Sequence, residues 1–261
     1  MKALYIASSG MAAQERNVEV ISNNIANMRT TGYKKQRAEF QDLLYQQIRR
    51  SGSTTSDQGT VVPAGIEIGS GVKTAATPRV MTQGSVSPTE KELDIAISGE
   101  GYFPITLPDG RTAYTRDGSF ERDDTGQLVT VDGYTVDPGI TIPGNATGVS
   151  ISADGIVEAY LPGATAPTQL GQLQVAQFVN KAGLQSFGQN LFLETATSGA
   201  AQTGTPKQDC LGNLMQGDLE MSNVNAVTEV ADLIAAQRAY EMNARVISGA
   251  DQMLQATSQL R

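Results

Sequence analysis

The stretch ISNNIANMRTTGYKKQ, residues 21–36, decides how the chain is organised, because a helical pattern ends inside it. Thr30-Thr31-Gly32 supplies the stop, since glycine readily takes the left-handed conformation that follows many helix ends. Asparagine is a poor helix former, yet three asparagines stand among apolar residues at helical spacing: Asn23, Asn24 and Asn27. The stretch therefore predicts the end of an N-terminal helix that carries amides on its flank.

Apolar residues before this stop recur every seven residues in two rows, and seven of the eight positions are apolar. Such spacing is typical of a helix that lies along another helix. At the usual rise per residue the helix would be about 40 Å long. The rows are Leu4, Met11, Val18 and Ile25, and Ala7, Gln14, Ile21 and Met28.

The last part of the chain repeats the spacing and predicts a second helix. Asn225 is its expected N-cap, and Glu229 in the first turn favours the helix dipole. Glu241 and Arg245 are spaced as an i,i+4 ion pair. Its main row is Leu233, Tyr240, Ile247 and Leu254, with Ala236 and Ala250 three positions after two of these, and its far face carries Gln252, Gln255 and Gln259.

The middle of the chain has the texture of short antiparallel strands. LDIAISG, residues 93–99, alternates like a strand, and Asp-Gly or Asp-Thr-Gly signals follow at 109–110, 117–118, 124–126, 132–133 and 154–155. Aspartate before glycine favours hairpins because glycine accepts a positive φ without strain. We therefore expect an α+β fold. Discontinuous N- and C-terminal helices form a coiled-coil stem, and a mainly antiparallel β domain is inserted between them.

This pattern predicts three regions along the chain. Residues 1–40 plus 222–261 form the inner helical coiled coil, and residues 93–187 form the outer β domain. Residues 41–92 plus 188–221 form an extended or β connecting region. Within that region SGSTTSDQGTVVP, residues 51–63, is a flexible or extended insert with little to bury.

Composition argues against several classes of protein. The net charge of -8 disfavours a nucleic-acid binder, which would repel the phosphate backbone. The chain has no histidine, the commonest general base and metal ligand, so the sequence favours a protein that is not an enzyme and has no cofactor or metal. A single cysteine, Cys210, allows no internal disulfide. No apolar run predicts a membrane span, and the first residues do not predict a cleaved signal peptide.

Other motifs have ordinary interpretations. GIEIGSG, residues 65–71, lacks the Lys-Ser/Thr of a phosphate loop and predicts turn or strand-edge glycines. RDDTG, residues 122–126, lacks EF-hand spacing and predicts a hairpin turn. Four carboxylates have no fixed spacing that would favour glycoside hydrolysis: Asp94, Glu100, Asp109 and Asp117. The basic groups Lys34, Lys35 and Arg37, and Arg49 and Arg50, are solvated or meet acidic neighbours in an assembly.

The helix asparagines flank the apolar rows and allow two interpretations. They form a solvated helix edge, or they meet neighbouring helices of other copies through donors and acceptors. The long rows favour the second, because a two-helix stem would leave apolar surface exposed. These flanking amides are Asn17, Asn23, Asn24 and Asn27.

Two long segments resemble known proteins. SSGMAAQERNVEVISNNIANMRTTGYKKQRAEFQDLLYQ, residues 8–46, resembles the N-terminal signature of bacterial flagellar rod and hook proteins. SNVNAVTEVADLIAAQRAYEMNARVISGADQMLQ, residues 222–255, resembles their C-terminal signature. The chain length, YTRDGSF at residues 114–120 and the insert after LLYQQIRRSG are similar to the distal-rod branch of this flagellar basal-body rod family.

The resemblance implies a structural subunit that self-assembles helically into a hollow drive shaft. Such a shaft transmits motor torque to the hook and carries the export channel. The terminal helices form an inner coiled-coil tube, and the insert at 51–63 stiffens the shaft by bridging neighbours. Gln252, Gln255 and Gln259 are the expected channel lining. The implied self-assembly seam is Leu4, Met11, Val18, Ile21, Ile25 and Met28 against Leu233, Tyr240, Ile247 and Leu254.

The resemblance also implies partners and a location. The expected partners are other copies of the chain, proximal rod proteins, the hook protein, the L-ring and P-ring bushing proteins and the flagellar export apparatus. Neither nucleic acid nor membrane insertion is expected. The rod of this family lies in the basal body and spans the periplasm to the outer membrane, after export through the flagellar type III secretion channel without a cleaved signal peptide.

Alternatives remain open at this point. Within the family, the chain could be a proximal rod or hook-type relative. Outside it, a β-domain enzyme with helical appendages would require clustered carboxylates, and an adhesin or tail-tube protein could also have heptad ends. An enzyme would tolerate loss of the two ends, whereas a rod protein would polymerise through them.

Overall fold

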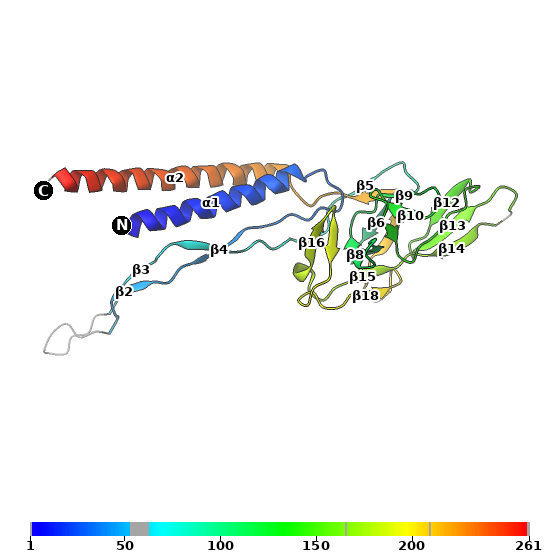
Figure 1. Cartoon of the computed structure of the whole chain (residues 1–261), viewed down its shortest axis with the longest axis horizontal. Helices are drawn as coiled ribbons and strands as arrows, with labels where there is room; N and C mark the ends of the chain where they lie inside the picture. The colour runs from blue at the N-terminus through cyan, green and yellow to red at the C-terminus, as the bar shows by residue number, and fades with distance from the viewer. Residues whose placement is uncertain (1, 53–62, 165, 209, 260–261) are drawn as a thin grey trace. The chain divides into compact units, whose positions relative to one another are not determined.

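The computed structural model describes residues 2–52, 63–164, 166–208 and 210–259 (Figure 1). It has an N-terminal and a C-terminal helix with mainly antiparallel strands between them, which confirms the α+β class. The chain forms two compact units. The helical unit is Met1–Ile25, Gln36–Pro78 and Asn225–Arg261, and the β unit is Ala26–Lys35 and Arg79–Val224. The three-region division stays a prediction, and its insert at 51–63 lies mostly outside the described residues.

Helix α1 (Lys2–Ala26) ends earlier than expected. Asn27 accepts a turn hydrogen bond from the Thr30 backbone N–H at 3.2 Å, and the Thr30 hydroxyl donates to Asn27 Oδ1 at 3.1 Å. These contacts replace the helical ladder, so Met28 lies in a turn and not on the helix. Gly32 has a φ of 66° and is the left-handed residue that the sequence indicated, although it lies beyond this turn.

Helix α2 (Ala226–Gln259) has 34 residues and would be about 50 Å long. Asn225 is its N-cap, as predicted, because Asn225 Oδ1 accepts from the Val227 N–H at 3.0 Å and the Thr228 N–H at 3.4 Å. Among the described residues, no helix is long and apolar enough to cross a membrane. Also among these residues, Glu241 and Arg245 form no ion pair, so the predicted i,i+4 pair is wrong.

The helical unit also contains two antiparallel ribbons. One pairs β1 (Glu39–Asp42) with β4 (Val72–Ala76), and the other pairs β2 (Gln46–Arg49) with β3 (Ile66–Ile68). Gly71 has a φ of 114° and lies so close to Ser9 that an added Cβ would be 2.2 Å from the Ser9 hydroxyl. The Ser9 hydroxyl also accepts a hydrogen bond from the Val72 N–H at 3.3 Å, so α1 contacts the first ribbon here.

The β unit contains a seven-stranded antiparallel sheet in the order β16-β17-β8-β7-β11-β10-β9. Pairing of β17 with β8 continues the sheet past the predicted edge near Phe187. The strand bounds are β16 (Gln185–Gly188), β17 (Leu191–Leu193), β8 (Thr112–Thr115), β7 (Phe103–Thr106), β11 (Thr135–Val136), β10 (Leu128–Thr130) and β9 (Phe120–Arg122).

Smaller sheets complete the β unit, together with one short 3-10 turn, η1 (Lys181–Gly183). A three-stranded sheet has the order β12-β13-β14, and three pairs join β15 to β18, β19 to β6 and β20 to β5. The bounds are β12 (Gly148–Ile151), β13 (Ile156–Tyr160), β14 (Thr168–Gln172), β15 (Val175–Gln177), β18 (Gln202–Gly204), β19 (Asn213–Gln216), β6 (Ile95–Ser98), β20 (Asp218–Glu220) and β5 (Val86–Pro88).

Four of the five predicted hairpin turns are confirmed. The turns at 109–110, 124–126, 132–133 and 154–155 join paired strands. Asp117-Gly118 is not a hairpin turn, because β8 already has β7 and β17 on its two sides. Instead, Asp117 Oδ1 accepts from the Ser119 N–H at 3.1 Å, and Gly118 lies against the Ile95 backbone.

The core of the β unit lies around β6 and β7. The expected alternation of β6 is wrong, because Ile95, Ala96 and Ile97 are all fully buried. Ile95 and Ile97 belong to the main core with Phe103 and Ile105, and Ala96 on the opposite face is buried too, so this strand is covered on both faces. A second cluster stacks four aromatic rings edge to face: Tyr102, Tyr114, Phe178 and Phe192.

Candidate functional site

The two helices lie side by side and run antiparallel (Figure 1). Asn24 Nδ2 contacts Glu229 Oε2 at 3.1 Å, and Gly10 lies against the side chain of Asn243. Fourteen residues separate the two positions on α1, and fourteen separate their partners on α2. A constant register of this kind means that α1 follows one face of α2 over several turns.

The side chains of α2 that face α1 are small or polar. Glu229 and Asn243 contact α1, and Ala236 and Ala250 continue the same seven-residue row and are buried. An added Cβ on Gly10 would be 2.9 Å from Asn243 Nδ2, so the helices approach closely there. Small side chains permit this approach, but they bury little apolar area. The contact between α1 and α2 therefore leaves most large apolar residues of α2 uncovered.

The predicted seam residues are only partly covered within one chain. Of the ten, Ile21 alone is buried. Tyr240 and Leu254 are 44% and 40% exposed, and Met28 lies off the helix at 37%. Half-buried members are Leu4, Met11, Val18, Ile25, Leu233 and Ile247. No contact described in one chain tests their role between chains, which stays a prediction.

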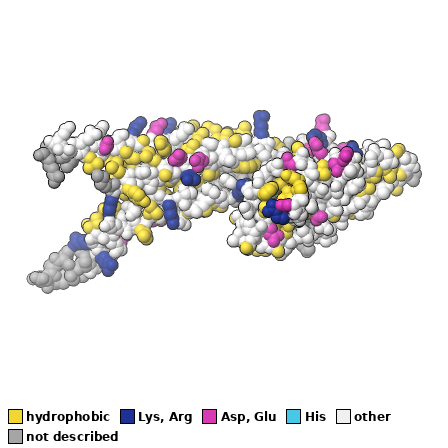
Figure 2. Space-filling model, viewed as in Figure 1, with side chains coloured by type: hydrophobic (Ala, Val, Ile, Leu, Met, Phe, Trp, Pro, Cys, Tyr) yellow, Lys and Arg dark blue, Asp and Glu magenta, His cyan; other side chains and the backbone are white. Residues whose placement is uncertain are grey.

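Helix α2 also exposes apolar side chains outside the predicted rows. Figure 2 shows hydrophobic side chains gathered over the helical unit. Soluble monomers rarely expose large contiguous apolar patches, and such patches usually mark interaction sites. The exposed apolar residues of α2 outside the seam are Val227, Val230, Ile234, Met242, Val246 and Met253.

Asn24 is the amide that the structure explains most fully. It is 1% exposed, and both interpretations made from the sequence are wrong for this residue. Its Nδ2 donates to the Gln36 carbonyl at 2.8 Å and to Glu229, while its Oδ1 accepts from the Gln36 N–H at 2.9 Å. The Asn24 amide therefore bonds both backbone groups of Gln36, as a paired strand would. It also links this segment to Glu229 in the first turn of α2.

The other predicted polar residues lie nearer the surface. Asn23 is exposed, and Asn17 and Asn27 are half-buried, with Asn27 bonded to Thr30 in the turn after α1. The predicted channel residues are all exposed on α2: Gln252, Gln255 and Gln259.

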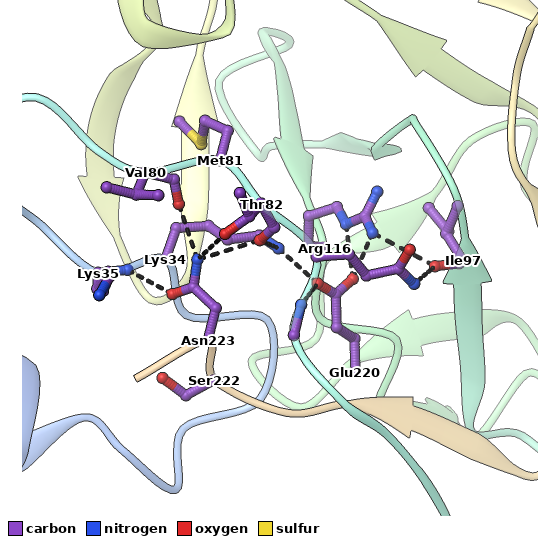
Figure 3. A network of polar contacts seen from close by, with 12 residues as sticks. Lys34, Lys35, Val80, Met81, Thr82, Ile97, Arg116, Glu220, Ser222 and Asn223 are labelled. Carbon is purple, nitrogen blue, oxygen red and sulfur yellow. Dashed lines mark hydrogen bonds and ion pairs between the residues drawn. The ribbon is translucent and has the colours of Figure 1, made fainter. Parts of the chain in front are cut away.

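A buried charge network within the β unit is a second, separate candidate site (Figure 3). Glu220 at the end of β20 is 1% exposed, and its two carboxylate oxygens bind different cations. Oε1 contacts the Lys34 ammonium and accepts from the Gly84 N–H at 2.9 Å. Oε2 accepts from Arg116 Nε at 2.8 Å and from a terminal nitrogen of the same guanidinium. We call Lys34, Arg116 and Glu220 the carboxylate clasp.

The clasp has two cations for one carboxylate, and backbone carbonyls supply the remaining acceptors. Arg116 donates to the carbonyls of Gly99 and Gly101 at 2.8 Å and of Ile97 at 3.3 Å. Lys34 donates to the Thr82 carbonyl at 2.8 Å. Buried charges are tolerated when they are paired and hydrogen-bonded in this way.

Asn223 extends the network from the clasp toward α2. Its Oδ1 accepts from the Lys35 N–H at 2.8 Å, and its Nδ2 donates to the carbonyls of Val80 and Thr82 at 2.8 and 3.0 Å (Figure 3). The segment after α1 and the segment before α2 are thereby held together inside the β unit. The clasp is thus a structural centre that fixes the two chain segments from which the helices continue.

The predicted basic groups need one correction. Lys34 was expected to be solvated or to meet another copy, but it is 2% exposed and pairs with its own Glu220. Burial lowers the pKa of Lys34 below its usual 10.5, and the Glu220 carboxylate opposes that shift. Arg37 forms an exposed ion pair with Glu39 at 2.6 Å, and Arg49 and Arg50 are exposed.

The remaining candidates have structural roles. The four carboxylates bind separate local partners: Asp94 binds Thr89, Glu100 binds Lys181, Asp109 binds Arg111 and Asp117 binds Ser119. Within the described part of the chain, no cluster of acidic or cysteine side chains could hold a metal ion. Residues 65–71 include strand β3 and its flanking glycines, and Cys210 is an exposed free thiol.

Sequence reasoning missed the clasp. Arg116 lies inside the YTRDGSF motif, which served only to indicate a resemblance, and Glu220 lies two residues before the C-terminal signature. The available signal was a charged residue inside or just before each quoted motif, namely Lys34, Arg116 and Glu220. Charged residues are mostly exposed, however, so the residue types alone favour solvent over burial.

Comparisons with known proteins agree with this architecture. Residues 4–34 match the model of the flagella basal body rod protein family, and residues 215–260 match the flagellar basal body rod FlgEFG protein C-terminal family. Residues 96–159 match the flagellar hook protein FlgE/F/G D1 domain.

Full-length relatives are similar over nearly the whole chain. The flagellar basal-body rod protein FlgG of Caulobacter vibrioides is 59% identical, with 100% of both chains covered. Proteins of the same name from Agrobacterium fabrum and Bacillus subtilis are 50% and 38% identical, covering 99% and 100% of this chain and 98% and 99% of their own length.

Removing the shared carboxylate should destabilise the β unit strongly. We expect Glu220→Gln to lower the free energy of unfolding by about 3–5 kcal/mol, because two buried cations lose their anion. Urea denaturation measures this loss. Glu39→Gln, which breaks an exposed pair, should cost about 0.5 kcal/mol or less. Equal effects of the two substitutions would contradict the central role of Glu220.

Removing Lys34 should destabilise the chain less than removing Glu220. Lys34→Met leaves the Arg116–Glu220 pair intact, so it should cost only about 1 kcal/mol. The unfolded chain binds the Lys34 proton more tightly than the folded chain, since burial lowers the folded pKa. The stability of the unsubstituted chain should therefore rise relative to Lys34→Met as the pH increases toward about 10.5. Parallel pH profiles would show that Lys34 carries no buried-charge penalty.

Asn24→Ala should loosen the junction between α1 and the returning chain. The Gln36 N–H and carbonyl lose their side-chain partner, a loss of about 1–3 kcal/mol. Hydrogen exchange of the Gln36 amide should accelerate by on the order of tenfold or more. The matched change Asn17→Ala, on the same helix, should leave that amide unaffected. Unaltered exchange in Asn24→Ala would show that the amide pairing is dispensable.

Proposed function

This chain belongs to the flagellar basal-body rod protein family, as a structural subunit of the distal rod, and from that premise we propose how it assembles. Many copies stack helically into a hollow shaft that transmits motor torque to the hook and carries the export channel. The helices of neighbouring copies form an inner coiled-coil tube, and the β unit faces outward. The subunit catalyses no reaction in this role.

One observation carries the proposal: α2 exposes large apolar side chains along its length. The buried row that faces α1 consists of Glu229, Ala236 and Ala250 with Asn243, whereas Val227 and Met242 are 79% and 61% exposed. One copy of α1 leaves this surface in water, and helices from other copies would cover it. The β unit has its own buried core, which supports a division between a folded outer part and adhesive helices.

The proposed seam between copies keeps the heptad rows of both helices. Tyr240 and Leu254 support it best, because each is large, apolar and substantially exposed in one chain. Met28 can join it only from the turn after α1. The remaining members are Leu4, Met11, Val18, Ile21, Ile25, Leu233 and Ile247.

The insert at 51–63 is proposed to stiffen the shaft by bridging neighbouring subunits. Most of it lies outside the described residues, but the ribbon of β2 and β3 that leads into it is described. That ribbon is exposed throughout and carries Ile48 at 61% exposure, and Leu44 and Tyr45 just before it are 89% and 56% exposed. Apolar side chains on an exposed ribbon support a contact with another subunit.

The proposed partners follow from the same assembly. Proximal rod proteins and the hook protein would continue the shaft, the L-ring and P-ring proteins would surround it, and the export apparatus would deliver its subunits. We place the rod across the periplasm to the outer membrane and propose export without a cleaved signal peptide. The acidic balance, with a net charge of -8, supports an outer surface that does not bind nucleic acid.

Removing apolar side chains from α2 tests the proposed assembly. We expect Val227→Ser, Val230→Ser and Ile234→Ser, combined in one chain, to abolish rod formation and motility in a bacterium that lacks its own copy of the gene. Val131→Ser with Val179→Ser is the matched control, since both valines are exposed in the β unit at 67% and 84%. Normal rods from the α2 variant, seen by electron microscopy of basal bodies, would refute the proposal.

Gln252, Gln255 and Gln259 are proposed to line the export channel. A weakly charged wall would let unfolded cargo slide without sticking. Substituting all three by glutamate should slow the secretion of flagellar proteins while basal bodies still contain a rod. Substitution by serine, which adds no charge, is the control for lost side-chain length. Normal secretion rates with glutamate would remove these residues from the channel wall.

A further inference from the structure

A groove with an acidic rim runs between the two helices. Glu15, Val18 and Glu19 of α1 line one side of it, and Tyr240 and Glu241 of α2 line the other. Val18 is half-buried and Tyr240 is 44% exposed, so the floor offers apolar surface to a partner. Its three glutamates are exposed, and its lining contains no basic side chain.

Within the described residues, the groove carboxylates form almost no ion pairs. Glu19 contacts Arg16 at 3.9 Å, and both side chains remain more than half exposed. In the described residues, Glu15 and Glu241 form no ion pair. An apolar floor between carboxylates fits a ligand that presents apolar side chains next to cations.

The neighbouring side of α2 has that complementary pattern. Arg238, Met242 and Val246 follow four-residue steps, and Arg245 lies three residues after Met242, so the four share one face of the helix. Met242 and Val246 are 61% and 52% exposed, and both arginines are exposed. No intrachain ion pair of the described residues engages either arginine. We call these four residues the basic strip.

We propose that the basic strip of one copy docks into the acidic groove of the next. Met242 and Val246 pack on Val18 and Tyr240, while Arg238 and Arg245 reach the glutamates of the rim. This contact rests on the proposed function, and it specifies which surfaces of the helical unit meet. Charge complementarity selects the occupant, because an acidic groove repels a second groove and a basic strip repels a second strip.

The contact has a consequence for the architecture. Each copy offers a groove and, beside it on α2, a strip that does not match itself, so docking is head to tail and leaves both ends of a row free. Head-to-tail contacts that do not close into a ring produce open helical polymers. The pattern of charge and apolar surface on two helices would thus set the direction in which subunits add.

Charge reversal tests the docking in the full-length chain. Glu15→Arg with Glu241→Arg, or separately Arg238→Glu with Arg245→Glu, should raise the concentration needed for half-maximal polymerisation by about tenfold. Combining all four substitutions should restore it to within about threefold, because opposite charges face each other again. The control reverses exposed charges of the β unit, Arg122→Glu with Asp124→Arg, and should have no effect.

Cross-linking identifies the surfaces directly. In a Cys210→Ser background, a mixture of Val18→Cys chains and Met242→Cys chains should give disulfide-linked dimers of mixed composition on mild oxidation. Dimers that form equally from Met242→Cys chains alone would show strip-to-strip contact and overturn the proposal.

Two other results have separate meanings. If the unsubstituted chain polymerises and no charge reversal changes this, the groove-and-strip contact is wrong and the rod function stands. If the unsubstituted chain never polymerises, in solution or on a purified basal body, the proposed assembly fails and the docking fails with it.

Discussion

The β unit depends on one buried carboxylate that is shared by two cations. Glu220 brings together Lys34 from the segment after α1, Arg116 from the end of β8 and the Gly84 N–H from the loop before β5. A single anion therefore joins segments that are far apart in the sequence. Four backbone carbonyls accept further hydrogen bonds from the two cations, so the extra positive charge is surrounded by acceptors in the core. Because these contacts hold Lys34 and Glu220 in place, they fix the two points at which the chain leaves the β unit and continues into the helices.

In the helical unit, by contrast, the contact between the helices leaves large apolar side chains uncovered. Its internal contact uses small and polar groups, with Gly10 against Asn243 and Asn24 against Glu229. These contacts define register and closeness without covering the large apolar side chains. A structural subunit of a polymer needs this combination, because an intramolecular partner that covered every apolar row would leave nothing for the next copy. In the proposed rod, the same side chains that are exposed in one chain become the core of the shaft.

The sequence predicted the fold class and most local structure for identifiable physical reasons. Seven-residue spacing indicates helices, Asn225 had the side chain of an N-cap, and three Asp-Gly pairs and one Asp-Thr-Gly marked four real hairpins. The failures have two causes, which are competition from a distant strand in one case and from local turn bonds in the other. Asp117-Gly118 has hairpin chemistry, but β8 already has a neighbour on each side. Met28 continued the heptad, but the turn bonds between Asn27 and Thr30 ended the helix first.

By itself, the sequence determined two heptad helices at the ends of the chain, a strand-and-turn middle and the resemblance to flagellar rod proteins. These properties follow from periodicity and local turn chemistry, which operate over a few neighbouring residues. Tertiary structure alone decided that Lys34, Arg116 and Asn24 are interior residues and which row of α2 meets α1. The reason is that burying a charge or an amide is favourable only beside its partner, and those partners lie up to 205 residues away in the chain.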